Sequence, residues 1–459
     1  MPNQSTNNEV NVIILAAGQG TRMNSSVSKV LHEVGNKTLI QHVIDAAMPL
    51  ASSINVIIGH NSESVKKSIQ NNLIKWVLQK NQLGTGHAVM QAIPSIKKDS
   101  MCLILYGDVP LIQTQTLINL LEKANKTGFS LLTVIQNDPS GYGRIIRDSS
   151  KSIQSIIEHK DANTEELEID EINTGIMAIT GALLTKYLNQ LEPNNSQGEL
   201  YLTDIVEKAV KDNVNIASFI CENSTEVMGI NDKNNLAEAE RAYQLKIADE
   251  LMSDGLTIKD PSRFDCRGNL IFGNDCIIDV NVVFEGEVKL GKNVLISPNC
   301  IIKNSKIGDH VHIMPNSIIE DSVIGSHASI GPFARIRPKT KIGNHAKIGN
   351  FVEVKKSTIG DNSKVSHLSY IGDSQVGKGV NIGAGVITCN YDGVNKNQTT
   401  IGDGAFIGSN SQLIAPVSIG KNATIGAGST ITQDAPDEKL TLSRNKQSTI
   451  SKWKRPQKK

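Results

Sequence analysis

Residues 324–348 read IGSHASIGPFARIRPKTKIGNHAKI, a stretch in which isoleucine returns at every sixth position. The same interval holds in three series along the chain: Phe272, Ile278, Phe284, Leu290, Ile296 and Ile302; Ile324, Ile330, Ile336, Ile342 and Ile348; Ile401, Ile407, Leu413, Ile419, Ile425 and Ile431. Hexapeptide repeats of this kind are typical of a parallel β-helix, in which coils stack and inward aliphatic side chains form columns. An aromatic content of 4% fits such a core.

A glycine follows the repeated aliphatic residue at many positions: Gly325, Gly331, Gly343, Gly349, Gly402, Gly408, Gly420 and Gly426. We expect glycine there because tight corners use backbone conformations that a Cβ atom disfavours. The period breaks between Thr388 and Ile401, where CNYDGVNKNQTT intervenes. A polar loop leaving a regular solenoid favours a functional role, and a harmless insertion is the alternative.

The sequence before residue 230 has a different pattern. Apolar runs at residues 11–17, 54–59, 101–106 and 129–135 alternate with segments that resemble helices, such as 114–123. This pattern predicts an α/β domain around a largely parallel sheet, which binds ligands outside the carboxyl ends of its strands.

The segment at residues 234–255, NNLAEAERAYQLKIADELMSDG, consists of good helix formers. We expect Asn234 or Asn235 to cap the helix and Gly255 to stop it. The predicted domains are therefore residues 1–233, a helical linker at 234–254, and residues 255–459 with a basic C-terminal tail.

Composition limits the possible partners. The formal charge of the 459-residue chain is +1, which gives no reason to expect nucleic acid or an anionic membrane as a partner. We find neither an apolar leader nor a segment long enough to insert in a membrane, so we expect a cytoplasmic protein. The cysteines, at positions 102, 221, 266, 276, 300 and 389, form no C-x-x-C pair. We expect most of them to be buried rather than bound to zinc or to each other.

Residues 15–23, LAAGQGTRM, follow an apolar run and resemble a phosphate-binding turn. The dinucleotide fingerprint needs a third glycine where Met23 stands, and the P-loop needs lysine after Gly20, where Thr21 stands. The turn can still present backbone N–H groups to a phosphate, with Arg22 and Lys29 as nearby cations. An ordinary glycine turn is the alternative.

Two further stretches belong to the same candidate crevice. Asp108 in YGDVPL stands just after an apolar run, where a carboxylate can hold Mg²⁺ that also meets substrate phosphates. A simple turn is the alternative. QLGTGHA, at residues 82–88, is a second glycine-rich turn whose backbone donors could contact the edge of a base.

In the repeat region, SHLSY places His367 and Tyr370 between the core positions Val365 and Ile371. Both therefore face outward. A histidine there can accept a proton near neutral pH, and an ordinary surface histidine is the alternative.

These stretches together closely resemble one family, that of the bifunctional N-acetylglucosamine-1-phosphate uridylyltransferase/glucosamine-1-phosphate N-acetyltransferase. The resemblance covers nearly the whole chain. The motifs that carry it are LAAGQGTRM, Lys29, QLGTGHA, YGDVPL, GYGRI, EHKDA, INTGI, GIND, the hexapeptide repeats, GPFARIRP, GNFVEVKK, SHLSYIGD, NIGAG and TCNYDG. It implies an α/β nucleotidyltransferase (Rossmann-like) domain, a helical arm and a left-handed parallel β-helix that forms a homotrimer.

The resemblance also implies the reactions. The β-helix domain would transfer acetyl from acetyl-CoA to glucosamine 1-phosphate. The first domain would then couple the product to UTP, with Mg²⁺, to give UDP-N-acetylglucosamine and pyrophosphate.

Carried over motif by motif, the first site would bind the nucleotide and the sugar through Leu15, Ala16, Ala17, Gly18, Arg22, Lys29, Gln79, Gln82, Gly84, Thr85, Tyr106, Gly107, Asp108, Gly143, Glu158, Asn173 and Asn231. Within this set Arg22 and Lys29 would be catalytic, and Asp108 and Asn231 would hold Mg²⁺. Gln19 stands where the family often has lysine. The only doubt that this raises is whether position 19 contributes to neutralising the phosphate charge.

In the second site, the sugar phosphate would be bound by Arg337, Lys355, Tyr370 and Asn381, and His367 would be the base. Acetyl-CoA would contact Ala384, Asn390, Tyr391, Ser409, Ala427 and Arg444. The alternatives are a single-activity nucleotidyltransferase with an oligomerising β-helix, as in ADP-glucose pyrophosphorylase, and a scaffold with two relic sites. The joint presence of SHLSY, TCNYDG and Arg444 favours two activities.

Overall fold

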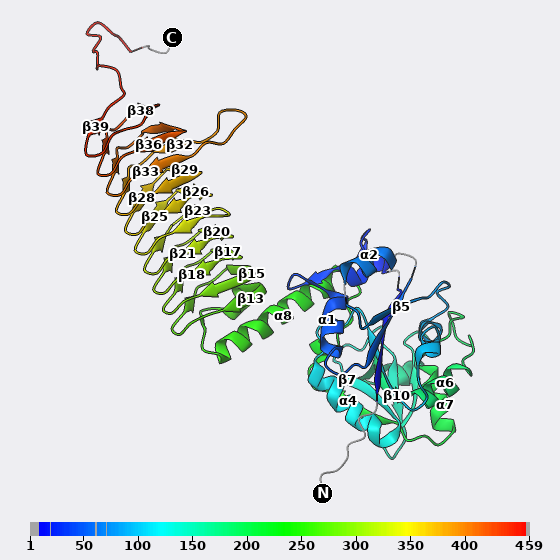
Figure 1. Ribbon diagram of the computed structural model, residues 1–459. Helices are drawn as coiled ribbons and strands as arrows, with labels where there is room; N and C mark the ends of the chain where they lie inside the picture. Colours follow the sequence, from blue (N-terminus) through cyan, green and yellow to red (C-terminus); the bar gives the residue numbers. More distant parts are fainter. Residues whose placement is uncertain (1–8, 19, 60–61, 70, 456–459) are drawn as a thin grey trace. The chain divides into compact units, whose positions relative to one another are not determined.

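The computed structural model describes residues 9–18, 20–59, 62–69 and 71–455, so Gln19 and the last residues of the basic tail lie outside the described residues. The chain forms two compact units, Met1–Tyr243 and Gln244–Lys459 (Figure 1).

The first unit is built on one mixed sheet with the strand order β11-β7-β10-β6-β1-β4-β5. Its strands are β1 (Val10–Ala16), β4 (Ser53–Ile58), β5 (Ile74–Leu78), β6 (Met101–Tyr106), β7 (Phe129–Ile135), β8 (Arg144–Arg147), β9 (Ile153–Ile157), β10 (Glu171–Thr180) and β11 (Ala217–Cys221), beside a small hairpin of β2 (Glu33–Val34) and β3 (Lys37–Thr38). Strands β4, β5, β6 and β1 run parallel, as predicted. Strand β10 is antiparallel to both β6 and β7, and the β8–β9 hairpin joins the same sheet through the pairing of β8 with β10.

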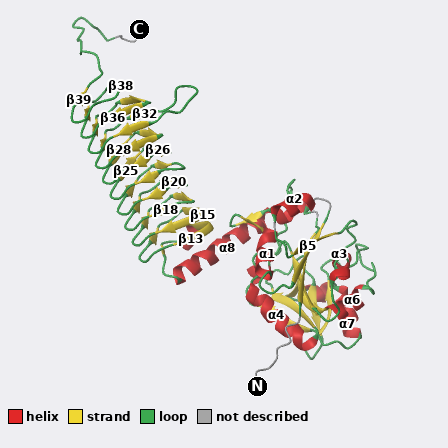
Figure 2. Ribbon diagram, viewed as in Figure 1, coloured by secondary structure: helices red, strands yellow, loops and turns green. Residues whose placement is uncertain are grey.

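Helices cover both faces of this sheet (Figure 2). They are α1 (Leu39–Ala47), α2 (Ser62–Ser68), α3 (Thr85–Met90), α4 (Thr114–Thr127), α5 (Thr164–Leu167), α6 (Gly181–Leu188) and α7 (Asp204–Lys211). In β1, Val12 and Ile14 pack in the core beneath α1 and α4, whereas Ile13 packs in the core beneath α3, α6 and α7. The sheet is therefore apolar on both faces, and polar chemistry is left to the strand ends.

Helix α8 (Lys233–Ser253) begins one residue earlier than the predicted linker helix. The prediction that Asn234 or Asn235 is the cap is wrong. Asp232 Oδ1 accepts the backbone N–H groups of both residues at 2.9 Å, as a capping carboxylate does. Gly255 follows the end of the helix with φ 103°, which only glycine adopts readily.

The second unit is a parallel β-helix, as predicted. Its strands are β12 (Thr257–Ile258), β13 (Phe264–Ile271), β14 (Ile277–Ile278), β15 (Val282–Leu290), β16 (Leu295–Ile296), β17 (Ile301–Lys303), β18 (Lys306–Ile307), β19 (His312–Ile313), β20 (Ile318–Glu320), β21 (Val323–Ile324), β22 (Ser329–Ile330), β23 (Arg335–Ile336), β24 (Lys341–Ile342), β25 (Lys347–Asn350), β26 (Glu353–Lys355), β27 (Thr358–Ile359), β28 (Lys364–His367), β29 (Tyr370–Gly372), β30 (Ser374–Val376), β31 (Asn381–Ile382), β32 (Ile387–Cys389), β33 (Thr399–Ile401), β34 (Phe406–Ile407), β35 (Gln412–Ile414), β36 (Val417–Ile419), β37 (Thr424–Ile425), β38 (Thr430–Ile431) and β39 (Leu440–Thr441).

Three hexapeptides make one coil of this β-helix. The register pairs Ile278 with Ile296, Ile296 with Ile313, Ile313 with Ile330 and Ile330 with Ile348. The aliphatic columns predicted from the sequence are buried, apart from Phe272 at the first coil, which is only partly buried. The residues between β32 and β33 leave the coil as a projecting loop (Figure 1).

The predicted reason for the repeated glycines is wrong. Of the eight, only Gly331 has a positive φ. The others are required because successive coils stack closely: a Cβ atom on Gly325 would lie 2.7 Å from the backbone N of Asn344. The left-handed conformation is adopted instead by residues such as His327 and Asn362, with φ of 60° and 59°.

The cysteines are free thiols, five of them buried and Cys389 half-buried. Burial raises the pKa of Cys300, in the β-helix core, to about 11, as expected of an inert thiol. Within the described part of the chain, no helix combines the length and apolar character needed to cross a bilayer.

Candidate active sites

The first candidate site is a cavity of about 290 Å³ at the carboxyl ends of β1 and β6. The two strand ends are tied together, since Gly107 N donates to Leu15 O at 2.9 Å. Most of the residues predicted to bind the nucleotide line this cavity: Leu15, Ala16, Ala17, Gly18, Lys29, Gln79, Gln82, Gly84, Thr85, Tyr106 and Asp108. The glycine-rich turns therefore meet at one place, as the sequence predicts.

A second cavity of about 840 Å³ adjoins the first. It contains Arg22 and the three residues predicted on the sugar side, Gly143, Glu158 and Asn173. Thr85 and Tyr106 line both cavities. The predicted nucleotide and the predicted sugar phosphate can thus lie end to end in the two cavities.

A polar cluster of four side chains lies beside the nucleotide cavity. Lys29 forms an ion pair with Asp108, and its Nζ also donates to Asn231 Oδ1 at 3.0 Å. Arg22 Nη2 donates to the same Asn231 oxygen at 3.0 Å. Although Lys29 and Asn231 are 202 residues apart, the fold brings the predicted catalytic cations and the predicted metal ligands together.

These ligands suit Mg²⁺. A carboxylate oxygen of Asp108 and the amide oxygen of Asn231 already converge on one cation, the Lys29 ammonium. Among the residues that the structure describes, no group of three or more histidine, cysteine, aspartate or glutamate side chains could enclose a metal. An ion bound here would keep water and substrate phosphate as its other ligands, which is how Mg²⁺ is commonly held.

Two glycines of the predicted turns, Gly20 and Gly84, have steric reasons. Gly20 has φ 62°, and a Cβ atom there would lie 2.7 Å from Lys29 Cβ, so a side chain would displace Lys29, which is predicted to be catalytic. A Cβ atom on Gly84 would lie 2.5 Å from Leu200 O. Beside it, the Nε2 atom of the buried Gln79 donates to Gly84 O at 3.2 Å, which orients the amide beside the cavity.

The sugar side contains acceptors in fixed positions. Thr203 Oγ1 donates to Glu158 Oε1 at 3.1 Å, and burial raises the pKa of Glu158. Asn173 N donates to Gly143 O at 2.8 Å. Burial also raises the pKa of Tyr106, so its hydroxyl remains protonated. A neutral, hydroxyl-rich ligand such as a sugar matches this lining.

The second candidate site lies on the β-helix. His367 ends β28, is exposed, and its Nδ1 lies 2.6 Å from Oδ1 of Asn350 on the preceding coil. Because an amide oxygen only accepts, Nδ1 carries the hydrogen in this contact, and in the neutral ring the lone pair is then on Nε2. The predicted base is therefore held in the tautomer that can take a proton. Sequence reasoning missed Asn350.

The predicted acetyl-CoA residues form a row on successive coils after His367. The register that pairs Val365 with Ile382, Ile382 with Ile407 and Ile407 with Ile425 puts His367, Ala384, Ser409 and Ala427 in one column. Arg444 closes the row by donating from Nη1 to Ala427 O at 2.9 Å. The row thus runs from the predicted base to the predicted end of the cosubstrate groove.

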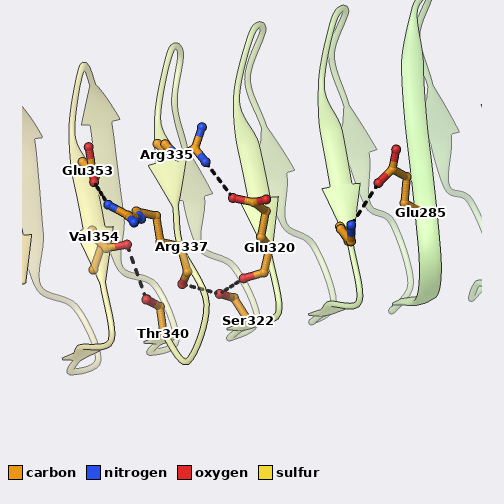
Figure 3. Close-up of polar contacts among 9 residues, drawn as sticks. Glu285, Glu320, Ser322, Arg335, Arg337, Thr340, Glu353 and Val354 are labelled. Carbon is orange, nitrogen blue, oxygen red and sulfur yellow. Dashed lines mark hydrogen bonds and ion pairs between the residues drawn. The ribbon is translucent and has the colours of Figure 1, made fainter. Parts of the chain in front are cut away.

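Three of the predicted sugar-phosphate residues, Arg337, Lys355 and Tyr370, occupy neighbouring coils of another face. Arg337 Nη1 donates to Glu353 Oε1 at 2.7 Å, which raises the pKa of Arg337 (Figure 3). Glu353 in turn pairs in register with Tyr370 on the next coil. The ring of Tyr370 lies against Gly372, where a Cβ atom would be 2.5 Å from Tyr370 Oη. Asn381 lies in β31, in the other sheet.

A third cation, Lys396 of the projecting loop, was missed by sequence reasoning. Its contact with Lys355 is the main cause of a lowered Lys355 pKa, followed by burial, with Arg337 adding a smaller contribution. Lys355 therefore interacts electrostatically with two other cations, as cations at a phosphate-binding site do. Lys396 could have been found from the sequence, because it is a single lysine in an otherwise uncharged part of the projecting loop.

Tyr391 and Asn390, both in that loop, differ in how exposed they are. Tyr391 is 60% exposed, and its hydroxyl donates to Gly393 O. Asn390 is buried, and its amide faces Asp373 rather than the row that leads to Arg444.

Comparison with known proteins gives matches in both units. The model of the MobA-like NTP transferase domain matches residues 12–164, and that of the bacterial transferase hexapeptide matches residues 398–433. The model of the GMPPB C-terminal domain matches residues 266–340.

Full-length relatives are also found. The bifunctional protein GlmU of Ruthia magnifica subsp. Calyptogena magnifica is 58% identical over 98% of this chain and 99% of its own length. Those of Vesicomyosocius okutanii subsp. Calyptogena okutanii (58%, over 96% of this chain and 98% of its own) and Idiomarina loihiensis (53%, over 98% and 99%) are also similar over nearly their whole length. The chain therefore belongs to the GlmU family, that of the bifunctional N-acetylglucosamine-1-phosphate uridylyltransferase/glucosamine-1-phosphate N-acetyltransferase, and the bifunctional interpretation of its sequence is confirmed.

Proposed function

We propose that the chain makes UDP-N-acetylglucosamine in two steps and that each unit carries one of them. Residues 1–233 would perform uridylyl transfer and residues 255–459 acetyl transfer, with the helix at 234–254 joining them. The observation that favours a second activity most directly is the hydrogen bond from His367 Nδ1 to Asn350, at the head of the row that ends at Arg444. An oligomerising β-helix would not need an oriented base.

In the uridylyl step, N-acetylglucosamine 1-phosphate attacks the α-phosphorus of UTP and pyrophosphate leaves. Arg22 and Lys29, which converge on Asn231, would neutralise the negative charge that develops on the phosphates. The turn at residues 15–18 would present backbone N–H groups to the triphosphate. Asp108 and Asn231 would hold Mg²⁺, which would supply further neutralisation of the phosphate charge.

In the acetyl step, the amine of glucosamine 1-phosphate must lose a proton to attack the thioester of acetyl-CoA. His367 Nε2 would take this proton, since Nδ1 is committed to Asn350. Arg337 and Lys355 would bind the sugar phosphate, with Tyr370 and Asn381 contacting the same substrate. Ala384, Ser409, Ala427 and Arg444 would line the groove for acetyl-CoA, and coenzyme A leaves as the thiol.

A combined assay tests both steps. The protein is supplied with glucosamine 1-phosphate, acetyl-CoA, UTP and Mg²⁺, and free thiol and UDP-N-acetylglucosamine are measured together. Release of thiol without UDP-N-acetylglucosamine would leave only the acetyltransferase. Uridylyl transfer to N-acetylglucosamine 1-phosphate without any thiol release would instead support a single-activity nucleotidyltransferase.

The acetyltransferase site is proposed to lie between subunits of a homotrimer. His367 and Tyr391 are exposed on the outside of the β-helix, where one subunit does not enclose a substrate. Each subunit has His367 and Arg444 in one row, so mixing inactive His367→Ala and Arg444→Ala subunits is expected to regenerate part of the acetyl transfer only if one site takes His367 from one subunit and Arg444 from another. If light scattering shows that the protein is a monomer and this monomer has full acetyl transfer activity, the prediction is contradicted.

The cytoplasm is the compartment we propose, since the cysteines are free thiols, as in proteins of reducing compartments.

A further inference from the structure

The projecting loop of the β-helix, residues 390–398, is held at both ends by one residue of the preceding coil. Asp373 follows β29 and is only 9% exposed. Its Oδ2 accepts a hydrogen bond from Asn390 Nδ2 at 2.5 Å, and its backbone oxygen accepts from Thr399 N at 3.3 Å. Asp373 therefore holds the point where the chain leaves the coil and the point where it returns.

Asn390 closes the neck of the loop from the other side. It is 7% exposed, and its backbone oxygen accepts from Asn397 N at 2.8 Å. Its side-chain amide is committed to Asp373, inside the fold. We propose that Asp373 and Asn390 form a clamp that positions the loop, and that Asn390 serves acetyl transfer through Asp373 rather than by binding acetyl-CoA with its amide. This inference rests on the proposed acetyltransferase function.

The charge balance of the clamp explains why both partners are needed. A nearly buried carboxylate is costly unless it is paired and hydrogen-bonded. Asp373 has two such partners: Asn390, and Lys356, whose Nζ lies 3.3 Å from Oδ1. Lys356 is 58% exposed in its side chain and screened by water, so the amide of Asn390 is the buried partner.

The clamp would fix two loop residues to which the proposed function gives a place beside the substrates, Lys396 and Tyr391. The loop contains Lys396, whose contact with Lys355 dominates the lowered Lys355 pKa. A loosened loop would withdraw Lys396 from the phosphate and Tyr391 from the cosubstrate. His367 belongs to β28, outside the loop. A clamp variant is therefore expected to raise KM for both substrates much more than it lowers kcat.

The first variant is Asn390→Asp, which sets a second carboxylate against Asp373. We expect KM for glucosamine 1-phosphate and acetyl-CoA to rise by roughly 10- to 100-fold, the usual effect of a broken buried hydrogen bond. We expect kcat to stay within about threefold, and trypsin to cleave the native protein after Lys396 faster than in the wild type. Asn422→Asp makes the same chemical change on another coil and should alter neither measurement.

The second variant, Asp373→Asn with Asn390→Asp, exchanges the two side chains. Asparagine tolerates the left-handed backbone at position 373, where φ is 47°. The amide introduced at position 373 can donate to the carboxylate introduced at position 390, so the clamp re-forms with its direction reversed. KM and the rate of cleavage should both return to within about threefold of the wild type.

The outcomes separate the clamp from direct binding. If cleavage returns to the wild-type rate but KM for acetyl-CoA stays raised, Asn390 binds the cosubstrate itself and the clamp proposal is overturned. It is also overturned if Asn390→Asp leaves the loop as resistant to trypsin as in the wild type. If the wild-type protein releases no thiol, the proposed function fails, while the cleavage measurements still report on the clamp.

Discussion

The Asp108→Ala variant is expected to lose uridylyl transfer by about 10³-fold or more, while acetyl transfer keeps its wild-type rate. Loss of a metal ligand removes charge stabilisation of several kcal/mol from the transition state, and about 1.4 kcal/mol corresponds to a factor of ten in rate. Asp108 also compensates the charge of Lys29, a cation that must point at the phosphates. Both losses fall in the first unit only.

The measurement is the release of pyrophosphate and of thiol by one preparation. Asp108→Asn is the more conservative variant, because its amide oxygen can still accept from Lys29 and keeps the local fold. Asp45→Ala is a matched control, since Asp45 forms an exposed ion pair with Lys37 in the same unit and should lose neither activity. Equal loss of both activities in a folded Asp108→Ala protein would contradict separate sites.

The β-helix could be predicted from sequence because its core needs one residue type at one interval. Each inward position of a coil is surrounded by its neighbours above and below, so aliphatic side chains recur along the chain. The conformational role of the glycines was mispredicted because closeness between coils is a tertiary property. Gly325 illustrates this, since the nearest atoms to its missing Cβ belong to residues 343 and 344.

The contacts that complete the acetyltransferase site depend on the length of a coil. Asn350 is 17 residues before His367, and Asp373 is 17 residues before Asn390. Counting back one coil from each candidate residue would have pointed to both partners. Hexapeptide periodicity gives the inward positions, whereas the register of the strands shows which outward side chains meet, as in the pairing of Asn350 with His367.

The first site was harder to predict from the residues alone. The turn at residues 15–18 and Asp108 follow neighbouring strands, so their meeting could be expected from α/β topology. Asn231 lies just before α8, far along the chain, and no local pattern links it to Lys29. Only the family resemblance brought it into the candidate set. The antiparallel β10 was likewise hidden, since an apolar strand buried on both faces looks the same in either direction.

The His367→Ala variant is expected to lower acetyl transfer by roughly 10²- to 10⁴-fold, the usual contribution of a positioned general base. The reason is the orientation of the ring. Nδ1 donates to Asn350 Oδ1 at 2.6 Å, so Nε2 has the free lone pair. Uridylyl transfer should not change in the variant.

Two control variants distinguish a catalytic base at His367 from an ordinary surface histidine. His345, which stacks on His327 with ring centroids 4.6 Å apart, is exposed on the same β-helix, and His345→Ala should keep full activity. Asn350→Ala removes the acceptor that fixes the tautomer, so a loss smaller than that of His367→Ala is expected, with substrate KM little changed. A folded His367→Ala protein that keeps most of its acetyl transfer at saturating substrate would rule out the base. Because His367 heads the row that ends at Arg444, such a result would leave the row as a binding groove whose substrate amine loses its proton to solvent.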